Sequence, residues 1–418
     1  MKWLALALTL VTTTPTSVTA QCFSQNDRVI TPSSSELSQL TRFAVALYKD
    51  MLARNTTGNY LVSPYSVWKA LTLAYFGSSG NTQAELEGVL GAEDKISSLK
   101  VWSHLDRLYG TEQSSEDEGV VMEGRAYLSG RRSLRPCVEE ILDDALRTLD
   151  FSNVYRAATD INQWTAQVTR GRAARLLQPN DLLGTNMVLA SAAAFKGAWA
   201  APFEVSSSRL QPFYATPEEP RDAVTMTQRG VFNYGESEDL GVQILELPYA
   251  NSPVSLYVLL PPLSAGSRGL ADTVERLSPP LLESALAAMT PAVVRVVMPK
   301  FKIESKDGDG LQETLSRLGV KDLFSERANL SVFSPEGNLR VGHAAHKAVM
   351  EVDEGGTDSS VSSSAKNFAV PPAGGRPSGE GGPLRNRVFV CNRPFAFLLR
   401  DTRAGRLLFM GALKDVPL

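Results

Sequence analysis

Hydrophobic positions in the first part of the chain recur at helical spacing. Leu37, Leu40, Phe43, Leu47 and Met51 are three or four residues apart and predict one apolar face of a helix that opens at the Ser-Glu-Leu of 35–37. Similar spacing predicts further helices at residues 66–75, 83–90, 137–149 and 161–169.

The second half of the chain has a different pattern. Short runs rich in β-branched and aromatic residues, bounded by Pro, Gly, Asn or Ser, predict strands at 242–247, 254–260, 293–297, 388–390, 395–399 and 407–410. These strands do not alternate with helices as in a βαβ fold, and no internal repeat is present. We therefore expect an α+β architecture with helices early and strands late.

The first twenty residues have the pattern of a secretory signal peptide. Lys2 supplies a positive charge, residues 4–11 form a short apolar core, and VTA at 18–20 ends in a small residue suited to cleavage. No run reaches the roughly 18 apolar residues that a membrane helix needs. We expect a secreted, extracellular protein without a membrane partner, whose mature chain begins at residue 21.

Charge and cysteine content argue against a nucleic-acid-binding protein and against a metalloprotein. The net charge is −3, with acidic and basic residues interspersed, so no nucleic-acid partner is expected. Three cysteines, Cys22, Cys137 and Cys391, leave at least one thiol free or paired between molecules, and their pairing is open. There is no CxxC motif or Cys/His cluster, so we expect neither a metal site nor a cofactor.

Two sequons gain meaning in a secreted chain. Asn55 precedes Thr56-Thr57, and Asn329 precedes Leu330-Ser331. Both fit the N-x-S/T acceptor pattern without proline at the middle position, so both predict a glycan on the protein surface.

Residues 355–385 interrupt the pattern of short strands. They are rich in Ser, Gly and Pro, carry almost no core-forming side chains, and become low in complexity from Pro371 to Pro383. A loop of this length inside a compact domain is either functional or a linker, and the sequence around it decides between the two.

Several segments, in order over nearly the whole mature chain, resemble the serpin family. They are NYLVSPYS at 59–66, INQW at 161–164, TRGR at 169–172, FKGAW at 195–199, PKF at 299–301, HKAV at 346–349, EGGT at 354–357, RPF at 393–395 and LFMG at 408–411. The resemblance implies that residues 21–418 form one α+β domain, a serpin fold with three β-sheets and about nine helices. It also implies an exposed reactive-centre loop at about 356–385.

It also implies an inhibitor of serine-type endopeptidases that acts as a suicide substrate. The target protease cleaves the loop and forms an acyl-enzyme, and the loop then inserts as a strand into the central sheet. The partner is a target serine protease held in a covalent complex, and the inhibitor itself is expected to be a monomer. The alternative is a non-inhibitory serpin, used as a carrier, chaperone or storage protein.

The segment that would insert separates its residues into two faces. From Thr357, the alternate residues up to Ala369 carry no charge, whereas Asp358 and Lys366 fall on the opposite face. A slip of one residue would bury both charges, which is costly. The resemblance places the loop hinge at Glu354, Gly355, Gly356, Thr357, Asp358, Ser359, Ser360 and Val361.

The resemblance also places a gate for sheet opening, called the shutter, at Ser63, Ser66, Ser191 and His346. The family usually has an asparagine at the position of Ser191, so this chain has a shorter side chain there.

The position of the reactive bond is left open. Counting in family register from Gly356 puts Val370 before the cut, although Pro371 would then follow it and block most serine proteases. Cleavage after Ala369 suits an elastase-like protease, cleavage after Phe368 a chymotrypsin-like one, and cleavage after Lys366 a trypsin-like one. Counting back from Arg393 places about 13 extra residues in the loop and makes the bond after Arg385 an alternative.

Other signals are weaker. The chain has only three histidines, His104, His343 and His346, and no GxSxG elbow, so it is not expected to be an enzyme. Arg131, Arg132 and Arg135 form a small basic patch that would suit a sulphated polysaccharide, although a solvated surface explains it better.

Overall fold

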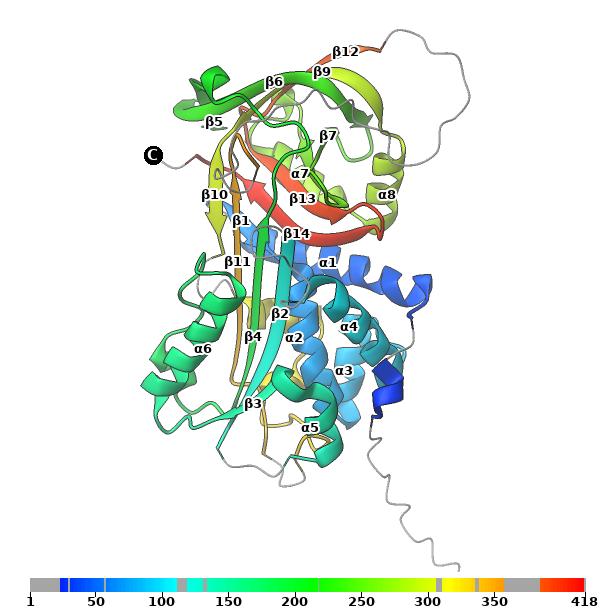
Figure 1. Ribbon diagram of the computed structural model, residues 1–418, viewed down its shortest axis with the longest axis vertical. Coiled ribbons are helices and arrows are strands. Elements are labelled where there is room, and N and C mark those ends of the chain that lie inside the picture. Colours follow the sequence, from blue (N-terminus) through cyan, green and yellow to red (C-terminus); the bar gives the residue numbers. More distant parts are fainter. Residues whose placement is uncertain are drawn as a thin grey trace, which may run out of the picture.

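A computed structural model describes residues 23–28, 31–55, 58–110, 119–130, 134–216, 218–305, 310–334, 338–356 and 384–416 (Figure 1). The expected signal peptide and most of the long loop lie outside these residues. In the part described, strands gather into two hydrogen-bonded sheets, and helices cover both faces of the smaller sheet.

The smaller sheet has five strands in the order β10-β11-β4-β2-β3. Its central pair, β4 and β11, is parallel, whereas β2 and β10 run antiparallel to β4 and β11 respectively. β3 is parallel to β2 but pairs only with its last four residues. The bounds are β2 Gly119–Ser129, β3 Leu146–Leu149, β4 Met187–Lys196, β10 Phe301–Glu304 and β11 His343–Val352.

The larger sheet has nine strands, in the order β1-β14-β13-β8-β7-β6-β9-β12 with β5 beside β6. The long strand β6 belongs to two groups, because one part pairs with β5 and β9 and its end pairs with β7. The group β5, β6, β9 and β12 is the third sheet expected from the resemblance. The bounds are β1 Tyr60–Val62, β5 Arg209–Thr216, β6 Glu219–Ser237, β7 Val242–Pro248, β8 Val254–Leu260, β9 Thr290–Pro299, β12 Asn386–Val390, β13 Phe395–Asp401 and β14 Arg406–Leu413.

Nine α-helices lie in the described part of the chain, as expected. They are α1 Ser34–Arg54, α2 Pro64–Gly77, α3 Gly80–Leu90, α4 Lys95–Tyr109, α5 Pro136–Leu142, α6 Val154–Val168, α7 Gly269–Arg276, α8 Pro279–Ala287 and α9 Leu311–Leu318. Short 3-10 helices are η1 Gln25–Arg28, η2 Asp143–Ala145, η3 Pro179–Leu182, η4 Val205–Ser207, η5 Leu263–Arg268 and η6 Asp322–Phe324.

Helix α2 is the centre of the main core. Ser63 caps it by accepting a hydrogen bond from the Ser66 backbone N–H, and Pro64 occupies its first turn. Every residue of α2 is buried, as expected for a helix that is apolar all round. A Cβ at Gly124 of β2 would lie 2.6 Å from the Ala70 backbone nitrogen, so glycine permits the close packing of β2 on α2.

Helix α6 covers the opposite face of the five-stranded sheet (Figure 1). A second, smaller apolar core lies between them. It joins Ile161, Trp164 and Val168 of α6 to small residues of the central strands, among them Ala190, Ala192 and Ala345.

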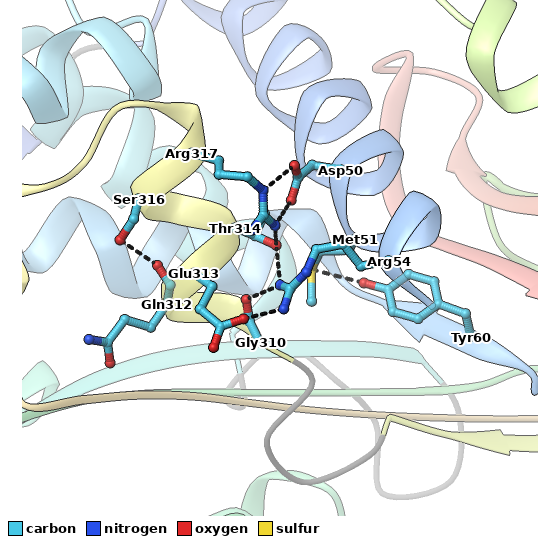
Figure 2. A network of polar contacts seen from close by, with 10 residues as sticks. All are labelled: Asp50, Met51, Arg54, Tyr60, Gly310, Gln312, Glu313, Thr314, Ser316 and Arg317. Carbon is cyan, nitrogen blue, oxygen red and sulfur yellow. Dashed lines mark hydrogen bonds and ion pairs between the residues drawn. The ribbon is translucent and has the colours of Figure 1, made fainter. Parts of the chain in front are cut away.

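A polar network joins helix α1 to helix α9 (Figure 2). Arg317 holds Asp50 with two hydrogen bonds, at 2.8 Å from Nε and 2.5 Å from an Nη, and Arg54 pairs with Glu313. Arg54 also donates to the Gly310 carbonyl at 3.0 Å. The network lies close to the start of β1, where Tyr60 donates to the Met51 sulfur.

One expectation was wrong in part. The helix expected over 137–149 ends at Leu142, because Asp143 has a positive φ of 34° and the following residues form η2 and β3. Three strand pairs, β2–β3, β4–β11 and β9–β12, are parallel. The connections in the last two pairs run over long stretches of chain, which local spacing does not register.

Candidate functional site

The hinge predicted from the sequence lies where β11 leaves the five-stranded sheet. Gly356 forms an isolated antiparallel bridge with Ala198, which follows the end of β4. The Trp199 backbone N–H donates to the Gly355 carbonyl, and the Phe203 N–H donates to the Glu354 carbonyl, both at 2.9 Å. The start of the loop is therefore tied by its backbone to the segment that follows β4.

Glu354 is held by its side chain as well. One carboxylate oxygen lies 2.8 Å from Lys300 Nζ, and the other accepts from the Ser208 hydroxyl at 2.7 Å. The Glu354 side chain is only 9% exposed. Burial alone would raise the pKa of Glu354, but the hydrogen bonds from Lys300 and Ser208 hold this pKa below its ordinary value. The carboxylate is thus an ionised anchor at the base of the loop.

Asp353 shapes the turn at the hinge. Its Oδ1 accepts the backbone N–H groups of Gly355 and Gly356 at 2.9 and 3.0 Å, and its own N–H donates to the Gly356 carbonyl at 2.9 Å. Burial raises the pKa of the Asp353 carboxyl despite these bonds. Sequence reasoning missed Asp353, Ser208 and the role of Lys300, because each acts through a partner far along the chain or through a backbone turn.

Gly356 occupies a position that only glycine fits. Its φ is +137°, a conformation that L side chains rarely adopt. A Cβ there would lie 2.1 Å from the Gly197 carbonyl oxygen and 2.8 Å from Ala198 Cα. The hinge glycine thus allows the loop backbone to pass directly against the end of β4.

Aromatic rings pack beneath this crossing. Trp199 stacks on Tyr249 with ring centroids 4.3 Å apart, and Tyr249 meets Phe195 edge-on at 4.6 Å. Trp199 Nε1 donates to the Asp353 carbonyl at 2.9 Å. The tryptophan therefore joins the aromatic cluster to the backbone of the hinge.

The four residues predicted for the shutter lie together beneath the central strands. Ser191 of β4 is directly opposite His346 of β11, and Ser63 and Ser66 belong to the start of α2. His346 Nε2 lies 3.0 Å from the Ser63 backbone nitrogen. His346 Nδ1 lies 2.9 Å from Ser191 Oγ and 3.4 Å from Ser66 Oγ. The shorter Ser191 side chain thus reaches the histidine directly.

These contacts fix one protonation state of His346. Since the Ser63 N–H can only donate, Nε2 accepts, and the proton sits on Nδ1 facing Ser191. The hydroxyls of Ser191 and Ser66 donate onward to the carbonyls of Ala345 and Ser63, at 3.2 and 3.1 Å. Burial, with a smaller contribution from Lys347, lowers the pKa of His346 to about 3. The cluster therefore uses a neutral imidazole.

The remaining predicted loop residues lie outside the described residues. They are Thr357, Asp358, Ser359, Ser360, Val361, Lys366, Phe368, Ala369, Val370 and Pro371. Arg385 is described: its side chain is exposed, and its carbonyl accepts the Val293 backbone N–H of β9 at 3.0 Å. The bond after Arg385 is thus already attached to the sheet at the start of β12.

The sequons and cysteines take up different positions. Asn329 is exposed, with its side-chain oxygen accepting from the Ser331 N–H at 3.3 Å, whereas Asn55 is half-buried at the end of α1. Cys391 is free and buried, and Cys137 is in a disulfide. Cys22 lies outside the described residues.

The described residues contain no group of three or more His, Cys, Asp or Glu placed to hold a metal ion. Within the same residues, no helix combines the length and the apolar character needed to cross a membrane.

Comparisons with known proteins give a family. A family model described as serpin (serine protease inhibitor) matches residues 38–416. Ipis-1 of Ixodes persulcatus is 31% identical over 91% of this chain and 98% of its own length. The leukocyte elastase inhibitor of Bos taurus is 30% identical over 90% of this chain and 98% of its own length.

Solved structures share the fold. Serpin48 of Tenebrio molitor, described as highly specific, superposes with a TM-score of 0.73 and 25% identity, covering 92% of this chain and 98% of its own. Human thyroxine-binding globulin superposes with a TM-score of 0.77, covering 92% of this chain and 99% of its own, and at 22% identity it shows the fold alone.

The geometry at Gly356 predicts a stability loss on substitution. We expect Gly356→Ala to lower the free energy of unfolding of the uncut chain by about 3 kcal/mol, because backbone strain and a backbone collision add together. Gly184 has a φ of +67° and open space around its Cβ position, so Gly184→Ala should cost only about 1 kcal/mol. Urea unfolding of the two variants, followed by circular dichroism, makes the comparison. Equal losses of unfolding free energy in both would contradict a backbone collision at position 356.

The neutral His346 predicts a specific acid sensitivity. The unfolded chain binds a proton on this residue below about pH 6.5, whereas the folded chain resists until about pH 3. The contribution of neutral His346 to the free energy of unfolding is therefore fully present above pH 6.5 and is lost as the pH falls toward 3. About 2 kcal/mol of it is lost between pH 7 and pH 5.

A glutamine at position 346 can accept from Ser63 and donate to Ser191 without titrating. His346→Gln should therefore lose about 2 kcal/mol less than the parent chain between pH 7 and pH 5, measured by urea unfolding at both values. His343→Gln is the comparison, on the same strand but outside the cluster. Burial lowers the pKa of His343 as well, but less than that of His346, so this variant should reduce the acid loss by less. An acid response of His346→Gln identical to that of the parent would show that His346 is not held neutral.

Proposed function

Because this chain belongs to the serpin family, we propose that it is a secreted serine protease inhibitor that acts as a suicide substrate. The target protease attacks a carbonyl of the loop with its serine oxygen and releases the downstream amine, which leaves an acyl-enzyme. The freed loop then inserts as a new strand into the five-stranded sheet and carries the attached protease with it.

The observation that carries the proposal is the parallel pairing of β4 and β11. These strands are neighbours over seven residue pairs, from His343↔Val188 to Val349↔Ala194. The loop leaves the end of β11, so a segment that folds back between the two strands runs antiparallel to both. Insertion would replace one parallel pairing by two antiparallel ones, which are slightly more stable per residue.

The side chains along these strands favour such an insertion. Half of the β4 and β11 residues that belong to the two apolar cores are alanine, including Ala190, Ala192, Ala345 and Ala348. The uncharged alternate residues from Thr357 onward would enter between them, leaving Asp358 and Lys366 on the opposite face. Gly355 and Gly356 provide the backbone freedom for the reversal.

The reactive bond that we favour lies at 369–370. Cleavage after Ala369 leaves a full inserting segment and avoids Pro371. The bond after Arg385 is less accessible, because its carbonyl would have to leave Val293 before a protease could bind it. Bonds after Phe368 and Lys366 remain candidates for proteases of other specificity.

Secretion and glycosylation belong to the same proposal. Residues 1–20 have a signal-peptide pattern, and exposed Asn329 suits a glycan. A sulphated polysaccharide at Arg131, Arg132 and Arg135 is a weaker part. Arg135 sits at the start of α5, with one guanidinium nitrogen 3.5 Å from the Ser331 carbonyl oxygen.

A second candidate is a non-inhibitory serpin. The fold neighbour thyroxine-binding globulin is named for binding thyroxine, and Pro371 would obstruct cleavage at the position given by family register. A chain of this kind would be cleaved as an ordinary substrate and would hold no protease.

The test is incubation with elastase-, chymotrypsin- and trypsin-type serine proteases. We expect an SDS-stable complex with at least one of them, most readily with the elastase type, and a C-terminal peptide whose mass gives the bond. Ser359→Glu would place a charge on the inserting face and should reduce the complex to background while cleavage continues. Ser360→Glu, on the opposite face, should leave the yield of complex near that of the parent.

Cleavage by all three proteases without complex would favour the second candidate. Equal yields from Ser359→Glu and Ser360→Glu would contradict the assignment of the two faces.

A further inference from the structure

The segment that precedes α1 is packed against the main core. Phe23 is 6% exposed and meets the Phe76 ring of α2 edge-on, with ring centroids 5.2 Å apart. The next turn, η1, lies beside α4, where Arg107 donates to the Arg28 carbonyl at 3.3 Å. Because burial of a large aromatic ring is favourable, Phe23 holds the start of the mature chain on the surface of the fold.

Cys137, in the first turn of α5, lies in the same part of the molecule. Its side chain is half-buried against the main core, and the Arg135 N–H donates to the Phe333 carbonyl at 3.2 Å. The Phe333 ring fills the space beside Gly77, the last residue of α2, since a Cβ there would lie 2.3 Å from the ring. Phe23 and the start of α5 are therefore both placed near the C-terminal end of α2.

The cysteine count leaves one partner for Cys137. The chain has three cysteines, of which Cys137 is in a disulfide and Cys391 is free and only 2% exposed. Cys22 is the remaining one. It directly precedes Phe23 in the sequence, and consecutive Cα atoms are about 3.8 Å apart, so Cys22 belongs to the neighbourhood in which Phe23 is held.

A bond between these two cysteines would join elements that loop insertion has to move apart. Helix α5 leads through η2 into β3, the edge strand that lies with β2 and β4 on one side of the β4–β11 pair (Figure 1). The segment before α1 continues into α1, which packs on α2, α9 and β14 outside that group of strands. When β4 separates from β11, α5 has to travel with β3 while α1 stays in place.

We propose that Cys22 and Cys137 form a disulfide that makes residues 22–28 a brace between α1 and α5, and that this brace restrains β3 and β2 against opening of the five-stranded sheet. The role in opening rests on the loop insertion proposed above. In forming the bond, the two thiols pass two electrons and two protons to a disulfide oxidant of the secretory pathway, which becomes a dithiol. The bond also closes a long loop and so removes conformations from the unfolded chain.

Peptide mapping of the secreted chain tests the bond itself. After denaturation, capping of free thiols and trypsin digestion without reductant, we expect peptide 21–28 joined to peptide 133–147, in which the Arg135–Pro136 bond resists trypsin. Cys391 should appear capped in peptide 388–400. The matched control Cys391→Ser should keep the joined pair. Peptides 21–28 and 133–147 found separate, or either one joined to 388–400, would overturn the proposal.

Hydrogen exchange followed by mass spectrometry tests the brace. In a Cys22→Ser/Cys137→Ser chain, the amides of β3 should exchange about fivefold faster than in the parent, whereas those of β8, in the larger sheet, should be unchanged. The melting temperature should fall by about 5 °C and shows that the variant is folded. Mild reduction of the parent chain with dithiothreitol should give the same change in β3 without a substitution.

Equal exchange of the β3 amides with and without the bond would overturn the brace, as would an equal rise in β3 and β8. Neither test uses the trapping of a protease as its readout. A chain that traps no protease can therefore pass both tests, and a chain that traps one can fail them, which keeps this proposal separate from the inhibitory function.

Discussion

The structure depends on the pairing of two parallel strands that lie side by side in the sheet but far apart in the sequence. β4 and β11 are about 150 residues apart along the chain, and their pairing brings His346 opposite Ser191. Parallel pairing is the weaker of the two kinds of strand pairing, and here it lies in the middle of the sheet with a long loop attached to one end. Under the proposed mechanism, a more stable arrangement forms when the loop enters between these two strands.

Polar contacts hold the paired strands β4 and β11 in place at two positions along β11. At the end of β11, Glu354 binds Lys300 and Ser208 while Asp353 holds the glycine turn. Near the middle, the neutral imidazole of His346 joins β11 to β4 and to the start of α2. Each hydrogen bond contributes only about 1 kcal/mol, so these contacts hold β4 and β11 together without making their separation very costly. The small core under α6 adds apolar contacts that would have to shift for the loop to insert as proposed.

The sequence predicted those parts of the molecule that depend on local spacing or on short motifs. The helical spacing at Leu37 to Met51 predicted α1, and the motifs around Ser63, Ser191 and His346 predicted residues that do lie together. The spacing of apolar residues wrongly predicted one helix over 137–149. The helix ends at Leu142, before Asp143 with its positive φ, and β3 follows. The spacing also did not predict the contacts of Lys300 and Ser208 with Glu354, because these arise only when segments far apart in the chain meet.

The heat stability of the chain cut inside its loop tests the central claim most directly. The claim is that residues 357–369 become an interior strand once the loop is free. Thermal unfolding of the intact chain and of the chain cut by a protease that forms no complex with it, followed by circular dichroism, makes the comparison. The account predicts that the cut chain melts at a clearly higher temperature than the intact one. A cut chain that melts at the same temperature or lower would contradict it.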